Sequence, residues 1–522
     1  MAATAVLPAT KTTLRTAVDL AAVFALLKLA IQVGATAWTV HLGWGYFRDE
    51  FYYIMCGRLL AWGYVDQGPM VALQARLGLA LFGKSIVGIR MFAALAGAAK
   101  VFLTGLLAWS LGGRRAAQAL AMTAVLVAPC YMGLDSFLSM NAFEPVFWMG
   151  AMLAAILLAR GESLRWWLFV GLCAGLGLEN KPSMTFYLVA LIVGMLLTPQ
   201  RRLLFNRWFA AASGLTVLLA LPNLIWQVQN HWPTMEFLHN DAVFGKNIHL
   251  SPPAFLLQQI LALHPLNVLV WLPGLVWLLI HRDARTMRWI GICYLVFLGT
   301  MMALHGKDYY LVPIYPVLFA AGGVAWQQLR NGSRYITVMA GALLVTGAII
   351  FPMAVPVLRP EPWMHYTQTL HLVSKTDQRE SADSGPLPQF YADRFGWQEL
   401  TDKVATAYRS LSPADQARAG IYGPNYGDAS SINFLGESYH LPFAISGHNN
   451  YYLWGPHGYT GEVMILVSSD SPEDLREFYR SVEVAGRVDH PYSMPYEHRT
   501  IYIARGRKIN LTADWPQFKH FE

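Results

Sequence analysis

The chain has 522 residues, of which 55% are hydrophobic and only 14% are charged, whereas an ordinary globular domain has about 25% charged residues. This composition excludes a soluble multidomain enzyme. Lys and Arg outnumber Asp and Glu by 24 to 12 in residues 1–356 and are outnumbered 15 to 20 in residues 357–522, so the net charge of +7 does not describe a nucleic-acid-binding surface.

The change in composition near Pro356 predicts two domains. We expect residues 1–356 to form a membrane domain and residues 357–522 to form a small α/β domain. A membrane span needs about 20 apolar residues. Eleven apolar runs meet this requirement loosely: 17–42, 85–111, 116–133, 141–160, 164–179, 183–198, 207–226, 262–281, 287–304, 309–328 and 334–355.

The charged residues between these runs predict one orientation. Fourteen of the 24 Lys and Arg of residues 1–356 lie at the N-terminus and in alternate short loops, and nine of the 12 acids lie on the opposite face. Basic loops stay in the cytoplasm, so the N-terminus should be cytoplasmic and the C-terminal domain extracytoplasmic. The long loops 43–84 and 227–261 then lie outside, where we expect the catalytic site.

The first outer loop begins with two adjacent acids, Asp49 and Glu50. Apolar residues then recur at helical spacing from Phe51 to Trp62, which predicts an amphipathic helix in the membrane interface. Its N-terminus would stabilise a charged carboxylate, and such a carboxylate can act as a general base. Alternatively, Asp49 only caps the helix, with Arg48 and Arg58 balancing its charge.

Five segments in chain order resemble the GT-C membrane glycosyltransferases, in the branch of the protein O-mannosyltransferases and the lipid A aminoarabinose transferase. The first is the loop that runs from the acidic pair through YY to GYVDQGPM. The others are GLDSFLSMNAFEPVFW, GLGLENKPSM, HGKDYYLVPIYPVLF, and YGPNYGDASSINFLG followed by ISGHNNYYLWG. The resemblance covers nearly the whole chain.

This resemblance implies a mainly α, polytopic membrane fold and transfer of a sugar from a polyprenyl-phosphate donor, with inversion at the anomeric carbon. Asp49 matches the catalytic acid of the family, and Glu50 completes the acidic pair of the mannosyltransferase branch. The family places a second acid near Asp135. That residue could orient the acceptor or the sugar, or it could cap a short helix together with Glu144.

The departing lipid phosphate requires cationic or hydroxyl groups. The KDYYLVP segment is the best candidate, because Lys307 and Tyr310 match a lipid-phosphate-binding position of the aminoarabinose transferase. An aromatic belt with a snorkelling lysine is the alternative for this segment. The predicted topology offers further phosphate-binding candidates on the same face: Tyr309, His305, Arg58, Lys181, Lys84 and Arg90.

The sequence requires no cofactor, but the resemblance implies a possible divalent metal site. Asp66 stands where the aminoarabinose transferase has a metal-binding glutamate, while Gln67 replaces a phosphate-binding lysine. A partner ligand could come from the histidines in or beside the second outer loop, although their spacing is no metal signature; they are His231, His239, His249 and His264.

Two lysines, Lys28 and Lys100, lie deep inside apolar runs. Each should face the bundle interior or a wet cavity, because an unpaired charge in lipid is costly.

In the C-terminal domain, strands are expected near 419–423, 463–469 and 499–505, with helices at 427–435 and 471–482.

Two functions compete for the whole chain. A glycosyltransferase would act on an envelope lipid, glycan or protein at the outer face of the bacterial inner membrane. A multi-span transporter or flippase of a lipid-linked sugar would also need many spans and intramembrane charge. The concentration of acids and aromatic residues in one-sided outer loops favours the enzyme.

Overall fold

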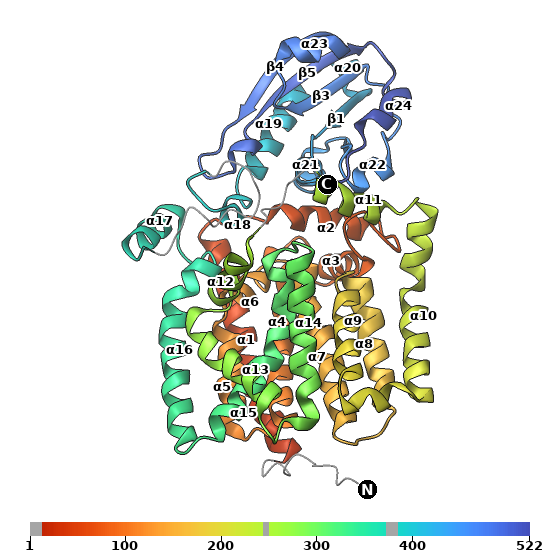
Figure 1. Cartoon of the computed structure of the whole chain (residues 1–522). Coiled ribbons are helices and arrows are strands. Elements are labelled where there is room, and N and C mark those ends of the chain that lie inside the picture. Colours follow the sequence, from red (N-terminus) through yellow and green to blue (C-terminus); the bar gives the residue numbers. More distant parts are fainter. Residues whose placement is uncertain (1–12, 244–249, 372–384) are drawn as a thin grey trace. The chain divides into compact units, whose positions relative to one another are not determined.

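The structure is a computed structural model that describes residues 13–243, 250–371 and 385–522 (Figure 1). These residues pack into two compact units that alternate along the chain. The bundle unit contains residues 13–38, 87–225 and 250–357. The sheet unit contains residues 39–86, 226–243, 358–371 and 385–522. The bundle unit therefore ends beside the predicted boundary at residue 356, while residues 39–86 and 226–243 pack with the C-terminal part.

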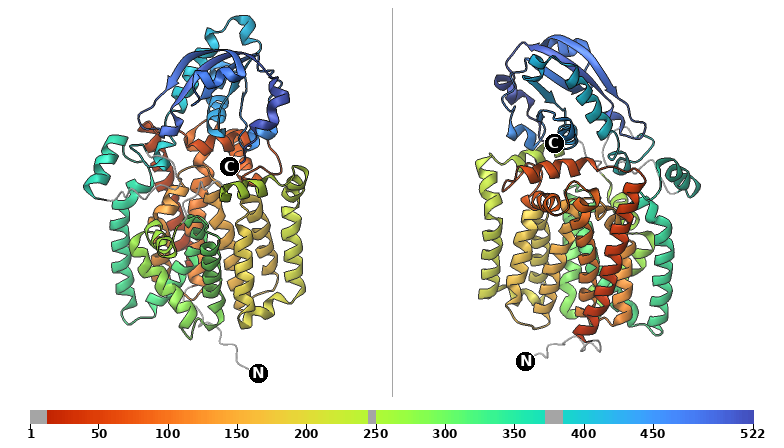
Figure 2. Two further views of the ribbon diagram at one scale, coloured as in Figure 1. Left: turned by 45° about the horizontal axis from the view of Figure 1, so that its top comes forward. Right: turned by 180° about the vertical axis from the view of Figure 1, so that it is seen from behind.

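The bundle unit consists of helices, and its long helices run side by side in all views (Figures 1 and 2). Its α-helices are α1 (Leu14–His41, as far as Trp38), α4 (Ile86–Ser110, from Val87), α5 (Arg115–Val127), α6 (Pro129–Leu134), α7 (Met140–Ala159), α8 (Trp166–Asn180), α9 (Met184–Leu196), α10 (Arg207–Gln229, as far as Ile225), α12 (Pro252–Ala262), α13 (Val268–Ile280), α14 (Arg288–Ala303), α15 (Tyr315–Gln327) and α16 (Gly332–Ala354). Short 3-10 helices are η1 (Pro199–Leu204), η2 (Pro265–Asn267), η3 (Arg285–Met287) and η4 (Asp308–Ile314).

Seven helices of the described chain are long and apolar enough to cross a membrane, or eight if the pair 252–262 and 265–280, bent by 103°, counts as one span. The prediction of eleven spans is not confirmed. The run 116–133 divides into α5 and α6, because Pro129 lacks the N–H needed to continue the helix. The run 183–198 contains only the 13 residues of α9. The predicted fold class, a helical polytopic membrane protein with a small C-terminal sheet, is confirmed.

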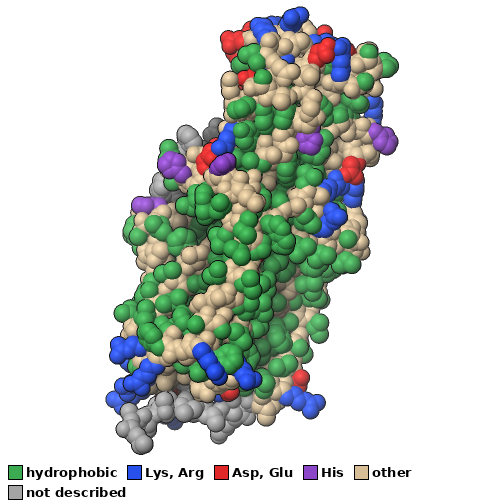
Figure 3. Space-filling model, turned by 90° about the vertical axis from the view of Figure 1, so that its right-hand side faces the viewer, with side chains coloured by type: hydrophobic (Ala, Val, Ile, Leu, Met, Phe, Trp, Pro, Cys, Tyr) green, Lys and Arg blue, Asp and Glu red, His purple; other side chains and the backbone are tan. Residues whose placement is uncertain are grey.

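The bundle helices differ in how much of their surface faces outward. In the span that η4 and α15 form together (residues 308–327), 78% of the most apolar 18-residue stretch is buried, compared with 11% in α10 and 17% in α16. The side of the bundle seen in Figure 3 is covered mainly by hydrophobic side chains. Exposed apolar helices of this kind suit lipid as the surrounding solvent, because every backbone polar group is bonded within the helix.

Small residues allow close packing in the bundle core. A Cβ atom added at Gly322 of α15 would lie 1.9 Å from the carbonyl oxygen of Val270 in α13. The backbones of these two helices therefore approach as closely as membrane helices do at small-residue interfaces.

Basic side chains gather at one end of the bundle (Figure 3). The loops that join its helices carry exposed arginines, which include Arg165, Arg201, Arg202, Arg207, Arg282, Arg285, Arg330 and Arg334. All of these belong to the loops that the charge pattern predicts to be cytoplasmic.

The sheet unit combines helices from the outer loops with a five-stranded sheet. Its α-helices are α2 (Arg48–Arg58), α3 (Pro69–Phe82), α11 (Pro233–Val243), α17 (Pro360–Thr369), α18 (Gln389–Ala392), α19 (Trp397–Ser410), α20 (Pro413–Gln416), α21 (Tyr426–Leu435), α22 (Asn450–Trp454), α23 (Pro472–Phe478) and α24 (Leu511–Asp514). The strands and 3-10 helices are β1 (Ala419–Tyr422), β2 (Ala444–Ile445), β3 (Val463–Ser468), β4 (Tyr479–Val488), β5 (Arg499–Arg507), η5 (Gly436–Tyr439), η6 (Pro495–Glu497) and η7 (Trp515–Phe518).

The sheet has the order β2-β1-β3-β5-β4, with parallel pairs on the β2 side and antiparallel pairs on the β4 side. Strand β3 is buried on both faces. Met464 and Leu466 join a core with Leu475 of α23 and Trp515, while α19 packs on the sheet through β3, β4 and β5. A continuous apolar strand is what two covered faces require.

The α/β prediction for this region is confirmed, and one of its elements is wrong. The helix expected at 471–482 ends at Phe478, and β4 begins at the next residue. The start of this helix was predictable from the sequence, because Ser471 and Asp474 form a capping box. The apolar residues that continue the helical pattern instead pair with β5, for example Val482 with Ala504.

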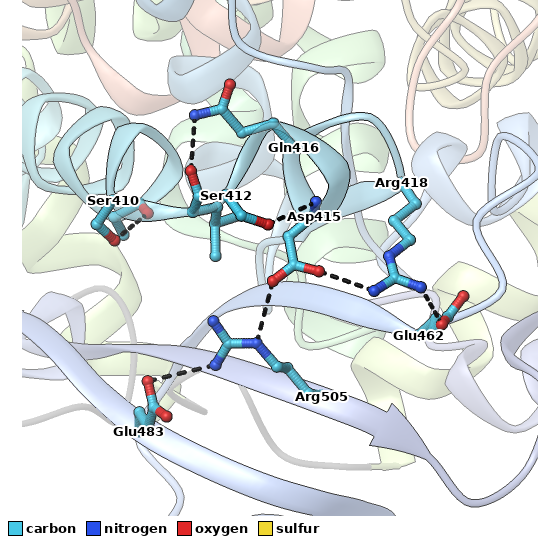
Figure 4. A network of polar contacts seen from close by, with 10 residues as sticks. Ser410, Ser412, Asp415, Gln416, Arg418, Glu462, Glu483 and Arg505 are labelled. Atoms are coloured by element: carbon cyan, nitrogen blue, oxygen red, sulfur yellow. Dashed lines mark hydrogen bonds and ion pairs between the residues drawn. The ribbon is translucent and has the colours of Figure 1, made fainter.

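A polar network joins α20 to strand β5 on the surface of the sheet (Figure 4). Asp415 accepts hydrogen bonds from Arg418 at 2.8 Å and from Arg505 at 3.4 Å. Arg505 also donates to Glu483 of β4 at 3.3 Å. Exposed pairs of this kind add little stability each, so the apolar faces of the sheet dominate its stability.

Candidate active site

Helix α2 carries the acidic pair Asp49 and Glu50 in its first turn. The backbone N–H of Phe47 donates to the Glu50 carboxylate at 2.8 Å, so Glu50 caps the helix from inside and is fully buried. Asp49 points elsewhere and its side chain is 27% exposed. The two acids therefore have different surroundings although they are adjacent in sequence.

The Asp49 carboxylate is held through one of its oxygens. Its Oδ1 accepts a hydrogen bond of 2.8 Å from the Tyr426 hydroxyl and lies 3.6 Å from Nε of Arg48. Its Oδ2 has no hydrogen-bond partner among the described residues. An anchored carboxylate with one open oxygen can accept a proton from a hydroxyl brought to it.

The rest of α2 is more buried than an interfacial helix would be. Residues from Glu50 to Gly57 are all buried, because α2 packs against both α3 and α21. The helix ends at Arg58, so Leu59 and Trp62 are not part of it, and Trp62 is 65% exposed. The expected amphipathic helix is thus shorter and is packed on all sides.

Asp66 lies close to the same helix. Its Oδ1 accepts a hydrogen bond of 3.0 Å from the hydroxyl of Tyr52, whose ring stacks on Tyr426 with centroids 4.7 Å apart. Asn450, in the ISGHNNYYLWG segment, accepts from the backbone of Val65 at 2.6 Å. The motifs that carry the family resemblance at the two ends of the sequence therefore meet in this unit.

Arg58, a predicted phosphate-binding residue, is already paired. It forms an ion pair with Glu437, and its guanidinium lies 5.2 Å from the ring centre of Phe434. Lys84 pairs with the same carboxylate.

In the bundle unit, Asp135 lies at the end of α6 between two lysines. Its carboxylate is 3.0 Å from Nζ of Lys28 and also pairs with Lys100. All three side chains are almost completely buried. The prediction that Lys28 and Lys100 face the bundle interior is confirmed, and Asp135 reduces the cost of burying them.

Lys181 occupies a second buried polar cluster of the bundle. Its ammonium donates to Asn141 at 2.8 Å and to Glu144 at 3.1 Å. It also lies 4.5 Å from the ring centre of Tyr310 and 5.3 Å from that of Tyr309. The structure thus brings together three of the predicted phosphate-binding residues.

Lys307 precedes η4 and is half-buried. Its ammonium has no ion pair or hydrogen bond among the described residues, although it lies near enough to act electrostatically on Lys181. His305 is exposed and lines a hollow together with Leu250 and Met302. Within the part of the chain that the structure describes, Lys307 is therefore a cation available to an anion.

The structure gives no support to a metal at Asp66. Within residues 13–243, 250–371 and 385–522, no group of three ligand side chains includes it, and its Oδ1 already accepts from Tyr52. Of the predicted partner histidines, His264 accepts from the backbone of Leu266, and His249 lies outside the described residues. The described group spaced for a metal is His448, His520 and Glu522, which the sequence did not single out.

A buried carboxyl pair that the sequence did not predict lies behind Arg48. Asp428 of α21 and Glu497 of η6 are both buried and face each other. Burial, reinforced by the Asp428 charge, raises the pKa of Glu497 to about 8. One proton is therefore shared by the pair at neutral pH.

We expect Glu497→Gln to remove a pH dependence of stability. Between about pH 4.5 and about pH 8, the folded protein holds a proton that the unfolded chain has released, so the stability from this group falls as pH rises through that window. The melting temperature of Glu497→Gln should exceed that of the wild type by several °C at pH 8, and this advantage should vanish at pH 5.

The measurement is a thermal melt of the purified protein at both pH values. Glu483→Gln is the matched control, because Glu483 is an exposed carboxylate in the same unit. A Glu497→Gln protein with the pH dependence of the wild type would contradict this assignment.

The chain was compared with protein-family models, curated protein sequences and solved structures. Residues 66–226 match the family model described as dolichyl-phosphate-mannose-protein mannosyltransferase. No curated protein sequence matches the chain.

Among solved structures, ArnT from Cupriavidus metallidurans bound to undecaprenyl phosphate is 15% identical, with a TM-score of 0.60 over 92% of this chain and 97% of that one. The apo state of ArnT gives a TM-score of 0.58 over the same shares. The likeness covers nearly the whole of both chains. The resemblance predicted from the motifs is confirmed, and the chain has the fold of ArnT.

Proposed function

We propose that this chain is an inverting glycosyltransferase that moves a sugar from a polyprenyl-phosphate donor to an acceptor in the cell envelope. The observation that carries the proposal is the Asp49 carboxylate at the start of α2. It is anchored through Oδ1, and its Oδ2 has no partner among the described residues. The matched mannosyltransferase family model and the undecaprenyl phosphate bound to ArnT support the class of donor. The acceptor is an envelope lipid, glycan or protein.

The chemistry needs one base and one anion site. Asp49 accepts the proton of the acceptor hydroxyl while that oxygen attacks the anomeric carbon, and the bond from this carbon to the lipid phosphate breaks. The phosphate leaves as an anion, with inversion of configuration. Glu50 keeps α2 capped, and Asp135 holds Lys28 and Lys100 within the bundle.

The lipid phosphate is assigned to the bundle residues Lys307, Tyr310 and Lys181. Lys307 contributes an ammonium that has no partner among the described residues, and the Tyr310 ring lies against the buried Lys181 ammonium. Cations and hydroxyls in surroundings of low dielectric stabilise charge that develops on a leaving group more than they would in water. Tyr309, His305 and Arg58 belong to the wider set of candidates.

The protein is placed in the bacterial inner membrane, with the reaction at its outer face. We expect a reporter fused after Arg285 to be cytoplasmic and a reporter fused after Ala417 to be extracytoplasmic. The reason is that loops rich in Lys and Arg stay on the cytoplasmic side of the membrane. Paired alkaline phosphatase and green fluorescent protein fusions measure this. A cytoplasmic signal from the Ala417 fusion would contradict the proposed orientation.

A liposome assay separates the enzyme from a transporter of lipid-linked sugar. The purified protein is reconstituted with a radiolabelled polyprenyl-phosphate sugar and a mixed extract of envelope acceptors. The proposal predicts cleavage of the sugar–phosphate bond and label in an acceptor. Movement of intact lipid-linked sugar between leaflets, without cleavage, would favour the transporter.

A further inference from the structure

We propose that Tyr426 is a positioning residue for Asp49, so that the C-terminal part of the chain completes the catalytic site. This inference rests on the proposed function, since it concerns the same base. Tyr426 lies 377 positions from Asp49 in sequence, and both belong to the sheet unit.

The contact fixes one carboxylate oxygen and leaves the other open. The Tyr426 hydroxyl donates to Oδ1 of Asp49 at 2.8 Å, while Oδ2 has no partner among the residues that the structure describes. Burial raises the pKa of Tyr426 well above its ordinary value. The hydroxyl therefore keeps its proton at any working pH and remains a donor to the carboxylate.

Tyr426 is itself held on several sides. Its ring stacks on Tyr52 at 4.7 Å and contacts the His448 ring at 4.8 Å. Its backbone N–H donates to Nδ1 of His448 at 3.4 Å, and the Arg48 guanidinium lies 5.6 Å from its ring centre. This packing restricts the hydroxyl to one direction, which a free surface tyrosine could not achieve.

The sequence around Tyr426 is suited to this close approach. Asn425 caps α21 by accepting from the backbone of Asp428 at 3.0 Å, so that Tyr426 occupies the first turn. The next residue is Gly427, where an added Cβ atom would lie 2.6 Å from Cγ of Arg48. A side chain at this position would push α21 away from α2 and lengthen the contact with Asp49.

The charged and titratable groups around Asp49 determine how the hydrogen bond from Tyr426 affects its carboxylate. Arg48 faces Asp49 from its own helix, and Tyr426 faces it from α21. Arg48 in turn donates to the Tyr496 hydroxyl at 2.8 Å and lies 3.9 Å from Asp393. The Tyr426 hydroxyl is the donor that bonds directly to Asp49, and a hydrogen bond to a carboxylate favours its charged form.

The test is kcat and KM for sugar transfer by Tyr426→Phe. This variant keeps the ring and its stacking but loses the hydroxyl. We expect kcat to fall by about ten-fold or more, as for the loss of a hydrogen bond to a charged group, while KM for the donor stays near that of the wild type. A kcat at the wild-type value would overturn the proposal.

Tyr459→Phe is the matched control. Its hydroxyl donates to the backbone of Phe443 at 2.9 Å in the same unit, so the variant loses a comparable bond that does not concern Asp49. It should keep the kcat and the KM of the wild type. If both variants lower kcat equally, the role of Tyr426 is structural and the proposal fails.

A second measurement tests the contact without any substrate. Melting temperatures of Asp49→Ala, Tyr426→Phe and the double variant form a double-mutant cycle. The proposal predicts that the two changes are not additive, because either one removes the same hydrogen bond. Additive shifts would overturn it. An inactive wild type with a non-additive cycle would instead contradict the proposed function and leave the pairing in place.

Discussion

Asp49→Asn should lower the rate of sugar transfer by about 10²–10⁴-fold, which is the usual contribution of a general base. The exchange removes the ability to accept a proton and keeps the shape of the side chain. Tyr426 can still donate to the amide oxygen of asparagine, so the fold of the sheet unit should persist. Steady-state kinetics of the purified variant, together with a thermal melt, measure both effects.

Glu50→Gln is the matched comparison for Asp49→Asn. Glu50 accepts the backbone N–H of Phe47 and is buried, and a glutamine oxygen can still accept this bond. We therefore expect a smaller loss of rate from Glu50→Gln than from Asp49→Asn. Equal losses would mean that Asp49 is not distinct from its neighbour, and wild-type turnover in Asp49→Asn would remove it as the base.

Lys307→Ala should lower kcat/KM for the donor by roughly ten- to a hundred-fold, because a hydrogen bond to a charged group contributes about 1.5–3 kcal/mol. The unpaired Lys307 ammonium would contact the phosphate both in the bound donor and as it departs. The KM for the acceptor should stay nearly unchanged. Initial rates at varied donor and acceptor concentrations measure the two effects separately.

Two further variants separate phosphate binding from a snorkelling lysine in an aromatic belt. The belt interpretation predicts that Lys307→Gln has little kinetic effect, whereas phosphate binding predicts a loss close to that of Lys307→Ala. Tyr310→Phe should also weaken use of the donor. Arg330→Ala, an exposed arginine of a connecting loop, is the control. Wild-type donor kinetics in all three site variants would remove this segment from the site.

The local features of the site could be predicted from the sequence. The adjacent acids before an apolar run correctly placed the start of α2, because a carboxylate three residues into a helix caps its backbone. Lys28 and Lys100 were correctly expected to face the bundle interior, because lipid disfavours their charge. Neither inference required knowledge of the partner residue.

The partners could not be predicted, because they come from distant segments. Asp135 meets Lys28 and Lys100 only after three helices have packed. Tyr426 reaches Asp49 across most of the chain, and no local pattern marks a tyrosine as a partner of a carboxylate. The raised pKa of Glu497 could not be predicted either, since it depends on burial beside Asp428.

The ends of two helices also could not be predicted from the sequence. The helical spacing of apolar residues continues past Arg58 to Trp62, yet α2 ends at Arg58. Similarly, the helical pattern after Ser471 continues into β4, where pairing with β5 replaces helical hydrogen bonds. In both places tertiary packing decides between two patterns that the local sequence allows.

Mass spectrometry of envelope glycolipids, glycans and glycoproteins from a deletion strain tests whether this protein transfers a sugar through Asp49. The strain is complemented with the wild-type gene, with Asp49→Asn or with an empty vector. We expect one sugar-bearing species to disappear on deletion, to return with the wild type and to stay absent with Asp49→Asn, although the variant protein is present in the membrane. Full restoration by Asp49→Asn, or an envelope unchanged by deletion, would contradict the proposed function.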